Sequence, residues 1–203
     1  MTQQVFEEYA DDYDRWFNEH HDEYLAELSR IRQVLPPHNS RCIEVGVGSG
    51  RFAAPLGFRL GIEPSQALCQ MAYQRGIEVI RGIVEALPIR DGSYSFVLFI
   101  TVICFLDDPK VAFREIHRIL SQGGYLLTAF IEREGMIHQK YIQKGGKGRF
   151  LSHARYYSEE EVRKFLEDNG LGVIKVDSRA GFCIIISQKT IKEYTRPTGE
   201  SLK

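Results

Sequence analysis

The fold is decided by the segment Glu44-Val45-Gly46-Val47-Gly48-Ser49-Gly50-Arg51-Phe52. Apolar residues lead from Cys42 directly into three glycines at alternate positions, which predicts a short buried strand that ends in a sharp turn. Glycine adopts positive φ at no steric cost, and without a Cβ it lets a ligand approach the backbone. The pattern is E-x-G-x-G-x-G and not the G-x-G-x-x-G of dinucleotide sites, because Arg51 stands where the last glycine would be.

The bulk composition suits a single domain, since 43% of the 203 residues are hydrophobic. The 26 basic and 27 acidic side chains nearly cancel, so net charge gives no indication of binding to nucleic acid or to an anionic membrane. The four cysteines are scattered and form no C-x-x-C pair, which indicates reduced thiols. The start of the chain lacks the features of a signal peptide, and the longest apolar stretch, 96–106, is too short to span a bilayer. We expect a cytoplasmic protein with no membrane insertion and no nucleic-acid partner.

Residues 3–35 have helical periodicity, and Pro36-Pro37 ends the segment. Its first half is rich in aromatic and acidic residues, among them Tyr13 and Trp16. Two interpretations are open. The segment is either an amphipathic cap on the core or a lid whose aromatic side chains close over a ligand beside the glycine turn.

Short apolar runs and helical segments alternate over the next part of the chain. The predicted strands are 41–45, 58–62, 77–81, 94–101 and 125–131, and the predicted helices are 51–56, 66–75 and 107–120. This alternation predicts an α/β fold with a doubly wound, mostly parallel sheet, in which ligands bind beyond the carboxyl ends of the strands. The glycine turn, Glu63, Val84-Glu85 and residues 101–104 all fall at such ends, so we expect them to form one site.

Glu63, in the sequence Glu63-Pro64-Ser65, ends the second predicted strand. It follows Gly46 at nearly the spacing of roughly 20 residues at which a carboxylate receives the two hydroxyls of a ribose. Charge assistance makes such hydrogen bonds strong. The alternative is a solvated acid at a strand end.

Residues 132–157 interrupt the alternation, and basic residues outnumber the acids Glu132 and Glu134 there. The basic residues are Arg133, Lys140, Lys144, Lys147, Arg149 and Arg155. The segment is either a solvated, mobile loop or an acceptor-side flap whose charge favours an anionic substrate. Beyond it, Ser158 and Glu161 predict a capping box at the start of a helix that runs to residue 169. The runs 172–176 and 182–188 are then expected to pair as a hairpin at the sheet edge.

In this order and spacing, the features resemble the class I S-adenosylmethionine-dependent methyltransferases, in the small-molecule branch that includes the quinone-biosynthesis methylases. The resemblance covers roughly residues 9–188. Its motifs are the glycine turn after Glu44, the acid Glu63, Glu85-Ala86-Leu87-Pro88, Arg114-Glu115-Ile116-x-Arg118-Ile119-Leu120, Gly123-Gly124, and Tyr156-Tyr157-Ser158 with Glu160-Glu161.

The resemblance implies transfer of a methyl group from S-adenosylmethionine to a small-molecule acceptor by in-line displacement. It implies a Rossmann-like sheet of about seven strands with an antiparallel last strand and an N-terminal helical lid. One methyltransferase domain, 1–203, would comprise a lid (1–37), a cofactor-binding core (41–131), a flap (132–157) and a C-terminal helix with a strand pair (158–189).

The resemblance also assigns cofactor-binding residues. Glu44, Gly46, Gly48 and Gly50 would hold the methionine part of the cofactor, and Glu63, beside Pro64 and Ser65, would bind the ribose. Val84 and Glu85 would bind the adenine, and Thr101 and Val102 would line the site where the methyl donor meets the acceptor. Tyr13 and Trp16 would belong to the lid.

The chain departs from the family pattern at positions that concern base and acceptor recognition. Ile83 and Ser95 stand where many relatives carry acids, and the histidine often found near Cys104 is absent. A general base is needed only for a protonated acceptor, and the candidates in the expected lid and flap are His20, His21, His138 and His153. We name no catalytic residue, no metal site and no oligomeric state. The alternative function is a non-catalytic or nicotinamide-dependent nucleotide-binding protein on the same fold, against which Arg51 argues.

Overall fold

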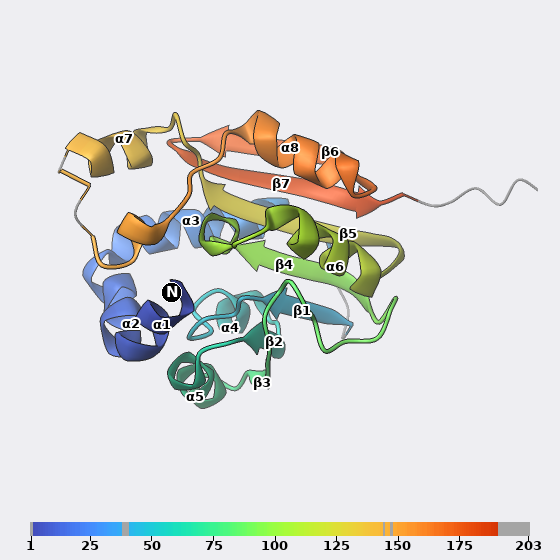
Figure 1. The fold of residues 1–203 in the computed structure, drawn as a ribbon, viewed down its shortest axis with the longest axis horizontal. Helices are drawn as coiled ribbons and strands as arrows, with labels where there is room; N and C mark the ends of the chain where they lie inside the picture. Colours follow the sequence, from blue (N-terminus) through green and yellow to red (C-terminus); the bar gives the residue numbers. More distant parts are fainter. Residues whose placement is uncertain (1, 38–40, 144, 147, 191–203) are drawn as a thin grey trace, which may run out of the picture.

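The structure, a computed structural model, describes residues 2–37, 41–143, 145–146 and 148–190. Its centre is a seven-stranded sheet with the order β3-β2-β1-β4-β5-β7-β6 (Figure 1). The strands are β1 (Cys42–Val45), β2 (Leu60–Glu63), β3 (Glu78–Arg81), β4 (Tyr94–Ile100), β5 (Leu120–Ile131), β6 (Leu171–Arg179) and β7 (Phe182–Lys189). β7 runs antiparallel to both of its neighbours, β5 and β6, and the other six strands share one direction. The prediction of a Rossmann-like, mostly parallel sheet with an antiparallel last strand is confirmed.

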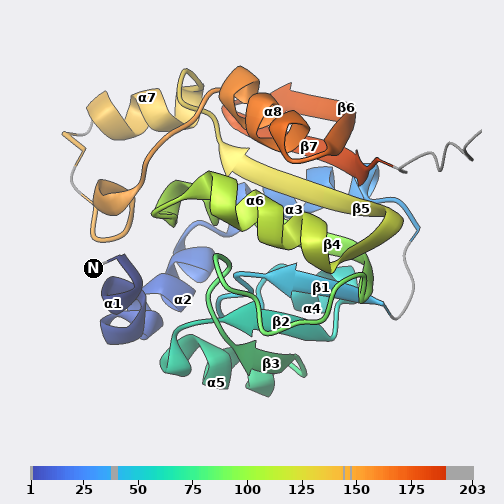
Figure 2. The same cartoon turned by 45° about the vertical axis from the view of Figure 1, so that its right-hand side comes forward.

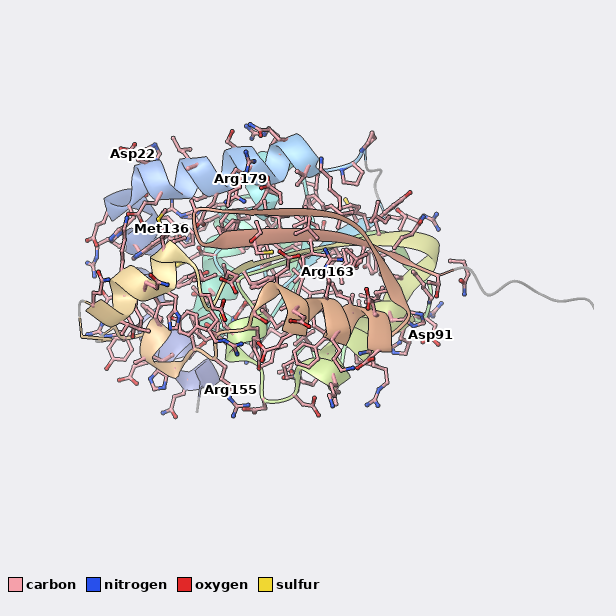
Figure 3. All side chains as sticks on the ribbon, turned by 90° about the horizontal axis from the view of Figure 1, so that it is seen from above. Asp22, Asp91, Met136, Arg155, Arg163 and Arg179 are labelled. Atoms are coloured by element: carbon pink, nitrogen blue, oxygen red, sulfur yellow. The ribbon has the colours of Figure 1, made fainter. Side chains whose placement is uncertain are left out.

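Helices cover both faces of the sheet, and each face has its own hydrophobic core. On one face lie α6 (Pro109–Ile119) and α8 (Glu159–Asp168), whose apolar side chains pack on β1, β4 and β5. On the other face lie α3 (His21–Val34), α4 (Ala53–Leu56) and α5 (Gln66–Gln74). Figure 3 shows the strands edge-on between α3 and α8. Burial on both faces explains why β1 and the end of β4 are continuously apolar apart from Glu44.

Local capping fixes where two helices begin. The Asp108 side chain accepts hydrogen bonds from the backbone of Lys110 and Val111, with Pro109 in the first turn of α6. Ser158 and Glu161 form the predicted capping box of α8.

The N-terminal helical segment is divided into three helices. They are α1 (Thr2–Glu8), α2 (Ala10–Glu19) and α3, and the breaks fall at Tyr9 and His20. His20 leaves the helical region at φ −115° and ψ 43°. Because neither break contains glycine or proline, the sequence gives no local signal for them. Figure 2 shows α1 and α2 at the edge of the sheet toward which the arrows of β1 and β2 point.

Two predicted boundaries are wrong. The helix predicted over 107–120 is α6, which ends at Ile119, but the strand predicted to begin at residue 125 after the two glycines begins at Leu120 as β5. Gly123 has φ +69°, and the pairing of β4 with β5 shifts register between Tyr94 and Phe96, so the glycines lie within an irregular strand start. Residues 132–157 are also not simply a loop. They contain α7 (Met136–Gln143) and a 3₁₀ turn, Leu151–His153.

All four cysteines are buried and free, as expected of reduced core thiols. Among the described residues, no helix combines the length and the apolar character that a membrane crossing requires.

Candidate functional site

A cavity of about 250 Å³ lies at the carboxyl edge of the sheet. It is close to the lower end of the size range of small-molecule pockets, roughly 300–1,000 Å³. Its walls are the ends of β1, β2 and β4, the turn after β3, and side chains of α1 and α2. This is the edge at which ligands bind in doubly wound sheets.

The glycine turn forms one wall of the cavity, and its shape depends on missing side chains. Gly46 and Gly48 have φ of +73° and +54°. A Cβ on Gly46 would overlap the side chain of Val102, and one on Gly48 would lie 3.2 Å from the hydroxyl of Tyr13. The amides of Gly46 and Val47 donate to the carbonyl of Ile62 at 2.8 and 2.9 Å, which ties the turn to β2. The turn is therefore a rigid cradle that only glycine can form.

Glu63 is joined to this turn by hydrogen bonds. One carboxylate oxygen accepts from the Gly48 amide and the other from the Ser65 amide, both at 3.0 Å. The side chain is buried, and this burial raises its pKa to about 7 in spite of the two amide donors. Each oxygen has a second lone pair, so the carboxylate can still accept bonds from a pair of ligand hydroxyls.

Glu44 lies behind the turn. Its side chain is buried, it accepts a hydrogen bond from the Ala53 amide, and burial raises its pKa well above the usual range. Its Oε2 has no hydrogen-bond partner among the described residues. Such an orphaned buried oxygen is costly and is typical of a functional position.

Asp14 of α2 fastens the N-terminal helices to the turn. It accepts hydrogen bonds from Ser49 (2.6 Å), Arg51 (2.7 and 2.8 Å) and Arg75 (2.7 Å). Burial opposes ionisation, but these donors prevail and lower the pKa of Asp14 to about 2. The adjacent Tyr13 is thereby held against Gly48.

Aromatic rings from three segments pack together at the cavity wall and behind it. Phe6 of α1 packs on Phe105 with centroids 4.9 Å apart and stacks on Phe150 at 5.2 Å. Tyr13 contacts both Phe6 and Phe150. An ion pair between Asp12 and Arg149 joins the same two segments. These contacts join residues 2–19 to residues 148–153 beside the cavity.

Most of the predicted cofactor-binding residues line this cavity. Those that do are Tyr13, Gly46, Gly48, Glu63, Pro64, Val84, Glu85, Thr101 and Val102. Thr101 has φ +53°, an unusual value for a residue other than glycine, at the end of β4.

The other four predicted residues have different surroundings. Glu44 lies behind the turn, and Gly50 packs against α5 at Ala72. Ser65 caps α5 and donates to Glu7. Trp16 stacks on His20 with centroids 4.7 Å apart. Their part in cofactor binding stays a prediction.

Neither the candidate bases nor the thiol of Cys104 lines the cavity. None of the four candidate histidines, all of which the structure describes, lines it. Burial raises the pKa of Cys104 to about 12, so this thiol stays protonated near neutral pH.

Sequence reasoning missed several residues of the site. Phe105, Leu106 and Asp107 line the cavity and directly follow the predicted segment 101–104. Phe6, which lines the cavity, and Asp14 and Phe150, which support its wall, come from distant segments. The aromatic and acidic composition of the N-terminal segment was the only sequence signal for Phe6 and Asp14.

Comparison with known proteins gives three results. Residues 43–128 match a family model described as a methyltransferase domain. An uncharacterized protein of Methanocaldococcus jannaschii is 35% identical over 171 residues, which cover 84% of this chain and 82% of that protein. An uncharacterized protein of Mycobacterium tuberculosis is 32% identical over 165 residues, and the match spans 80% of this chain but only 58% of that protein.

Among solved structures, a protein of Thermotoga maritima has the same fold with a TM-score of 0.85 and 34% sequence identity. The match covers 92% of this chain and 99% of that one. The Thermotoga protein is described as a SAM-dependent methyltransferase and a possible histamine N-methyltransferase.

Proposed function

The chain belongs to the class I S-adenosylmethionine-dependent methyltransferases, and we propose that it methylates a small-molecule acceptor. The observation that carries the proposal is the single cavity in which the glycine turn, Glu63 and the aromatic side chains of the N-terminal helices meet. S-adenosylmethionine supplies a methyl group on a positively charged sulfonium.

The residues of the cavity fit this cofactor. We assign the methionine part to the backbone of Gly46 and Gly48, where a Cβ would close the cradle. Glu63 would accept the ribose hydroxyls with the lone pairs that its two amide donors leave open. Val84 and Glu85 would hold the adenine, and Glu44 would stabilise the turn from behind.

Methyl transfer by in-line displacement needs alignment more than proton transfer. Correct placement of donor and acceptor can lower the barrier by roughly 7–11 kcal/mol. We assign this placement to Thr101 and Val102 at the end of β4 and to the aromatic rings of Phe6, Tyr13 and Phe105, which exclude water. No histidine among the described residues lines the cavity, so we assign no general base.

The contacts between residues 2–19 and 148–153 favour a small acceptor over a macromolecule. Phe150 stacks on Phe6, which lines the cavity, and Arg149 pairs with Asp12. A polymer substrate would have to displace these contacts. The name of the Thermotoga relative points to a small amine, in agreement with this size limit. We also propose that residues 1–37 act as a lid and residues 132–157 as a flap. A cytoplasmic location is part of the same proposal and is consistent with the four free, buried thiols.

The alternative of a nicotinamide-dependent enzyme has no supporting observation. Arg51, which replaces the third dinucleotide glycine, is bound to Asp14 and anchors α2.

Calorimetry with S-adenosylmethionine and S-adenosylhomocysteine tests the proposal. We expect the wild type to bind both and Gly48→Arg to bind neither, because the new side chain would fill the cradle against Tyr13. Gly92→Arg is the matched control, since Gly92 also has a positive φ of +65° but has no atom near its Cβ position. Absence of binding by the folded wild type would refute the proposal.

A further inference from the structure

Part of the cavity wall is not used by the cofactor assignment. This part, the acceptor end, consists of Phe6 of α1 and of Phe105, Leu106 and Asp107, which follow β4, and Tyr13 lies between it and Gly48. We propose that this end receives a small amine with an aromatic or other apolar body, and that the amine nitrogen is the atom methylated. The inference rests on the proposed function and specifies its acceptor.

The first argument is the sign of charge in the cavity wall. Three carboxylates line the cavity, those of Glu63, Glu85 and Asp107, and no lysine, arginine or histidine among the described residues does. An anionic acceptor would therefore enter a wall that repels it, whereas a basic nitrogen would be attracted.

The basic side chains of residues 132–157 do not offset this wall. Arg149 pairs with Asp12 and lies over the ring of Tyr9 at 3.9 Å. Arg133 pairs with Glu161 at 2.9 Å. Arg155 hydrogen-bonds with Tyr157, and Lys140 is exposed on α7. Lys144 and Lys147 lie outside the described residues. As an acceptor-side flap, this segment was expected to favour an anionic substrate, but none of its described basic side chains lines the cavity.

The second argument is the nature of the apolar surface. Phe6, Tyr13 and Phe105 present rings to the cavity, and Phe150 packs behind them. Aromatic faces carry negative electrostatic potential and attract cations, and they also stack on planar apolar groups. Rings beside a carboxylate suit a molecule with an apolar body and a basic nitrogen.

Asp107 is the carboxylate that distinguishes acceptor from cofactor. Glu63 is bound to the glycine turn, whereas the Asp107 side chain has no partner among the described residues. Its neighbour Asp108 is different, since it caps α6 and does not line the cavity. Both residues are exposed and carry the same charge at adjacent positions, and only Asp107 lines the cavity.

The reaction balances without a further reactant. The amine releases a proton to solvent and reacts as the neutral base. Its nitrogen lone pair forms the new N–C bond while the C–S bond of the donor breaks, and that electron pair remains on sulfur as a thioether. The methylated nitrogen then loses or keeps its proton according to its own basicity.

Matched pairs of ligands test the inference by calorimetry in the presence of S-adenosylhomocysteine. Suitable pairs are 2-phenylethylamine with 3-phenylpropionate and tryptamine with indole-3-propionate, because each pair shares a ring and a chain and differs in charge. We expect the amines to bind and the acids not to bind. With S-adenosylmethionine, mass spectrometry should then show an N-methylated amine.

Asp107→Asn should weaken amine binding several-fold and leave S-adenosylhomocysteine binding unchanged. Asp108→Asn is the control, because asparagine still caps a helix, and it should change neither. If S-adenosylhomocysteine does not bind to the wild type, the proposed function fails and the acceptor assignment fails with it. Three outcomes in which S-adenosylhomocysteine still binds would overturn the acceptor assignment alone. They are equal affinity for the acids and the amines, no binding of any amine, and the same behaviour of both variants.

Discussion

The carboxylate of Asp14 accepts two hydrogen bonds from the guanidinium of Arg51, at 2.7 and 2.8 Å. Such a bidentate pair fixes both position and orientation. Asp14 belongs to α2 and Arg51 directly follows the glycine turn, so the pair attaches the N-terminal helices to the turn. Arg51, the residue that distinguishes this turn from a dinucleotide motif, therefore also anchors α2 to the turn.

The first prediction concerns acid stability. The usual pKa of an aspartate, 3.8, is lowered to about 2 at Asp14. A lowered carboxyl pKa stabilises the fold above the unfolded pKa, and this contribution disappears as pH falls from about 4 to about 2. Asp14→Asn should therefore reduce the free energy of unfolding by about 2 kcal/mol at pH 7 and by much less at pH 2.5. Urea unfolding of both proteins at a series of pH values measures the difference.

Asp91→Asn is the control for this experiment. Asp91 also pairs with an arginine, Arg118, at 2.7 Å, but its side chain is 79% exposed. An exposed pair contributes about 0–1 kcal/mol, so this variant should stay close to the wild type at every pH. A loss in Asp14→Asn that does not depend on pH would contradict the assignment of the effect to ionisation.

The second prediction concerns the pH dependence of ligand binding at Glu63. Burial holds the pKa of Glu63 at about 7, and ribose hydroxyls donate to the ionised form. Affinity for a ribose ligand should therefore rise with pH, by up to about tenfold between pH 6 and pH 8. 5′-Methylthioadenosine is the suitable ligand, because it has the ribose diol but no amino acid that titrates. Calorimetry over this range measures the profile.

Glu63→Gln should bind weakly and without this pH dependence, since an amide does not ionise and cannot accept from both the Gly48 and Ser65 amides. Glu85→Gln lies in the same cavity and should keep the wild-type profile. A flat profile in the wild type would show that Glu63 does not receive the ribose.

The central part of the site could be predicted from sequence because its signals are local. The glycine turn, Glu63 and the Val84-Glu85 turn each follow a strand directly, and parallel strands bring their ends to one edge. The rest of the wall depends on tertiary contacts. Ser49 and Asp14 are 35 positions apart, and nothing near either residue indicates their hydrogen bond.

Residue type also could not decide which aromatic side chain faces the site. Tyr13 and Trp16 lie on the same short helix and have similar local composition, but Tyr13 contacts Gly48 and Trp16 stacks on His20. The directions of the two rings depend on how α2 is placed between the breaks at Tyr9 and His20. These breaks arise from tertiary packing and have no local sequence signal.

The third prediction concerns release of the product. Phe150 stacks on Phe6, a residue of the cavity wall, at an interplanar angle of 26°. Phe150→Ala should accelerate dissociation of S-adenosylhomocysteine several-fold, because Phe6 loses the ring that holds it in the wall. Stopped-flow displacement measures the rate. Phe165→Ala is the control, since Phe165 also stacks on a phenylalanine, Phe113, at 26° but packs α8 on α6. It should lower stability without changing the release rate, and equal rates in both variants would refute a role for Phe150 in retaining the product.

The fourth prediction separates backbone strain from steric overlap in the glycine turn. Gly46→Ala should be destabilising for two reasons, a positive φ of +73° and a Cβ that overlaps Val102. The first costs about 1 kcal/mol and the second roughly 1–3 kcal/mol. Gly92→Ala, at φ +65° with open space around it, should show the first cost alone.

Val102→Ala removes the side chain with which the new Cβ would collide. In a double-mutant cycle, Gly46→Ala should therefore cost less in the Val102→Ala background, by about the overlap energy of 1–3 kcal/mol. Free energies of unfolding of the four proteins give the coupling directly. Additive effects would contradict the close approach of Gly46 to Val102 at the cavity wall. A coupling of the expected size, accompanied by loss of S-adenosylhomocysteine binding in Gly46→Ala, would show that this close approach shapes the cofactor site.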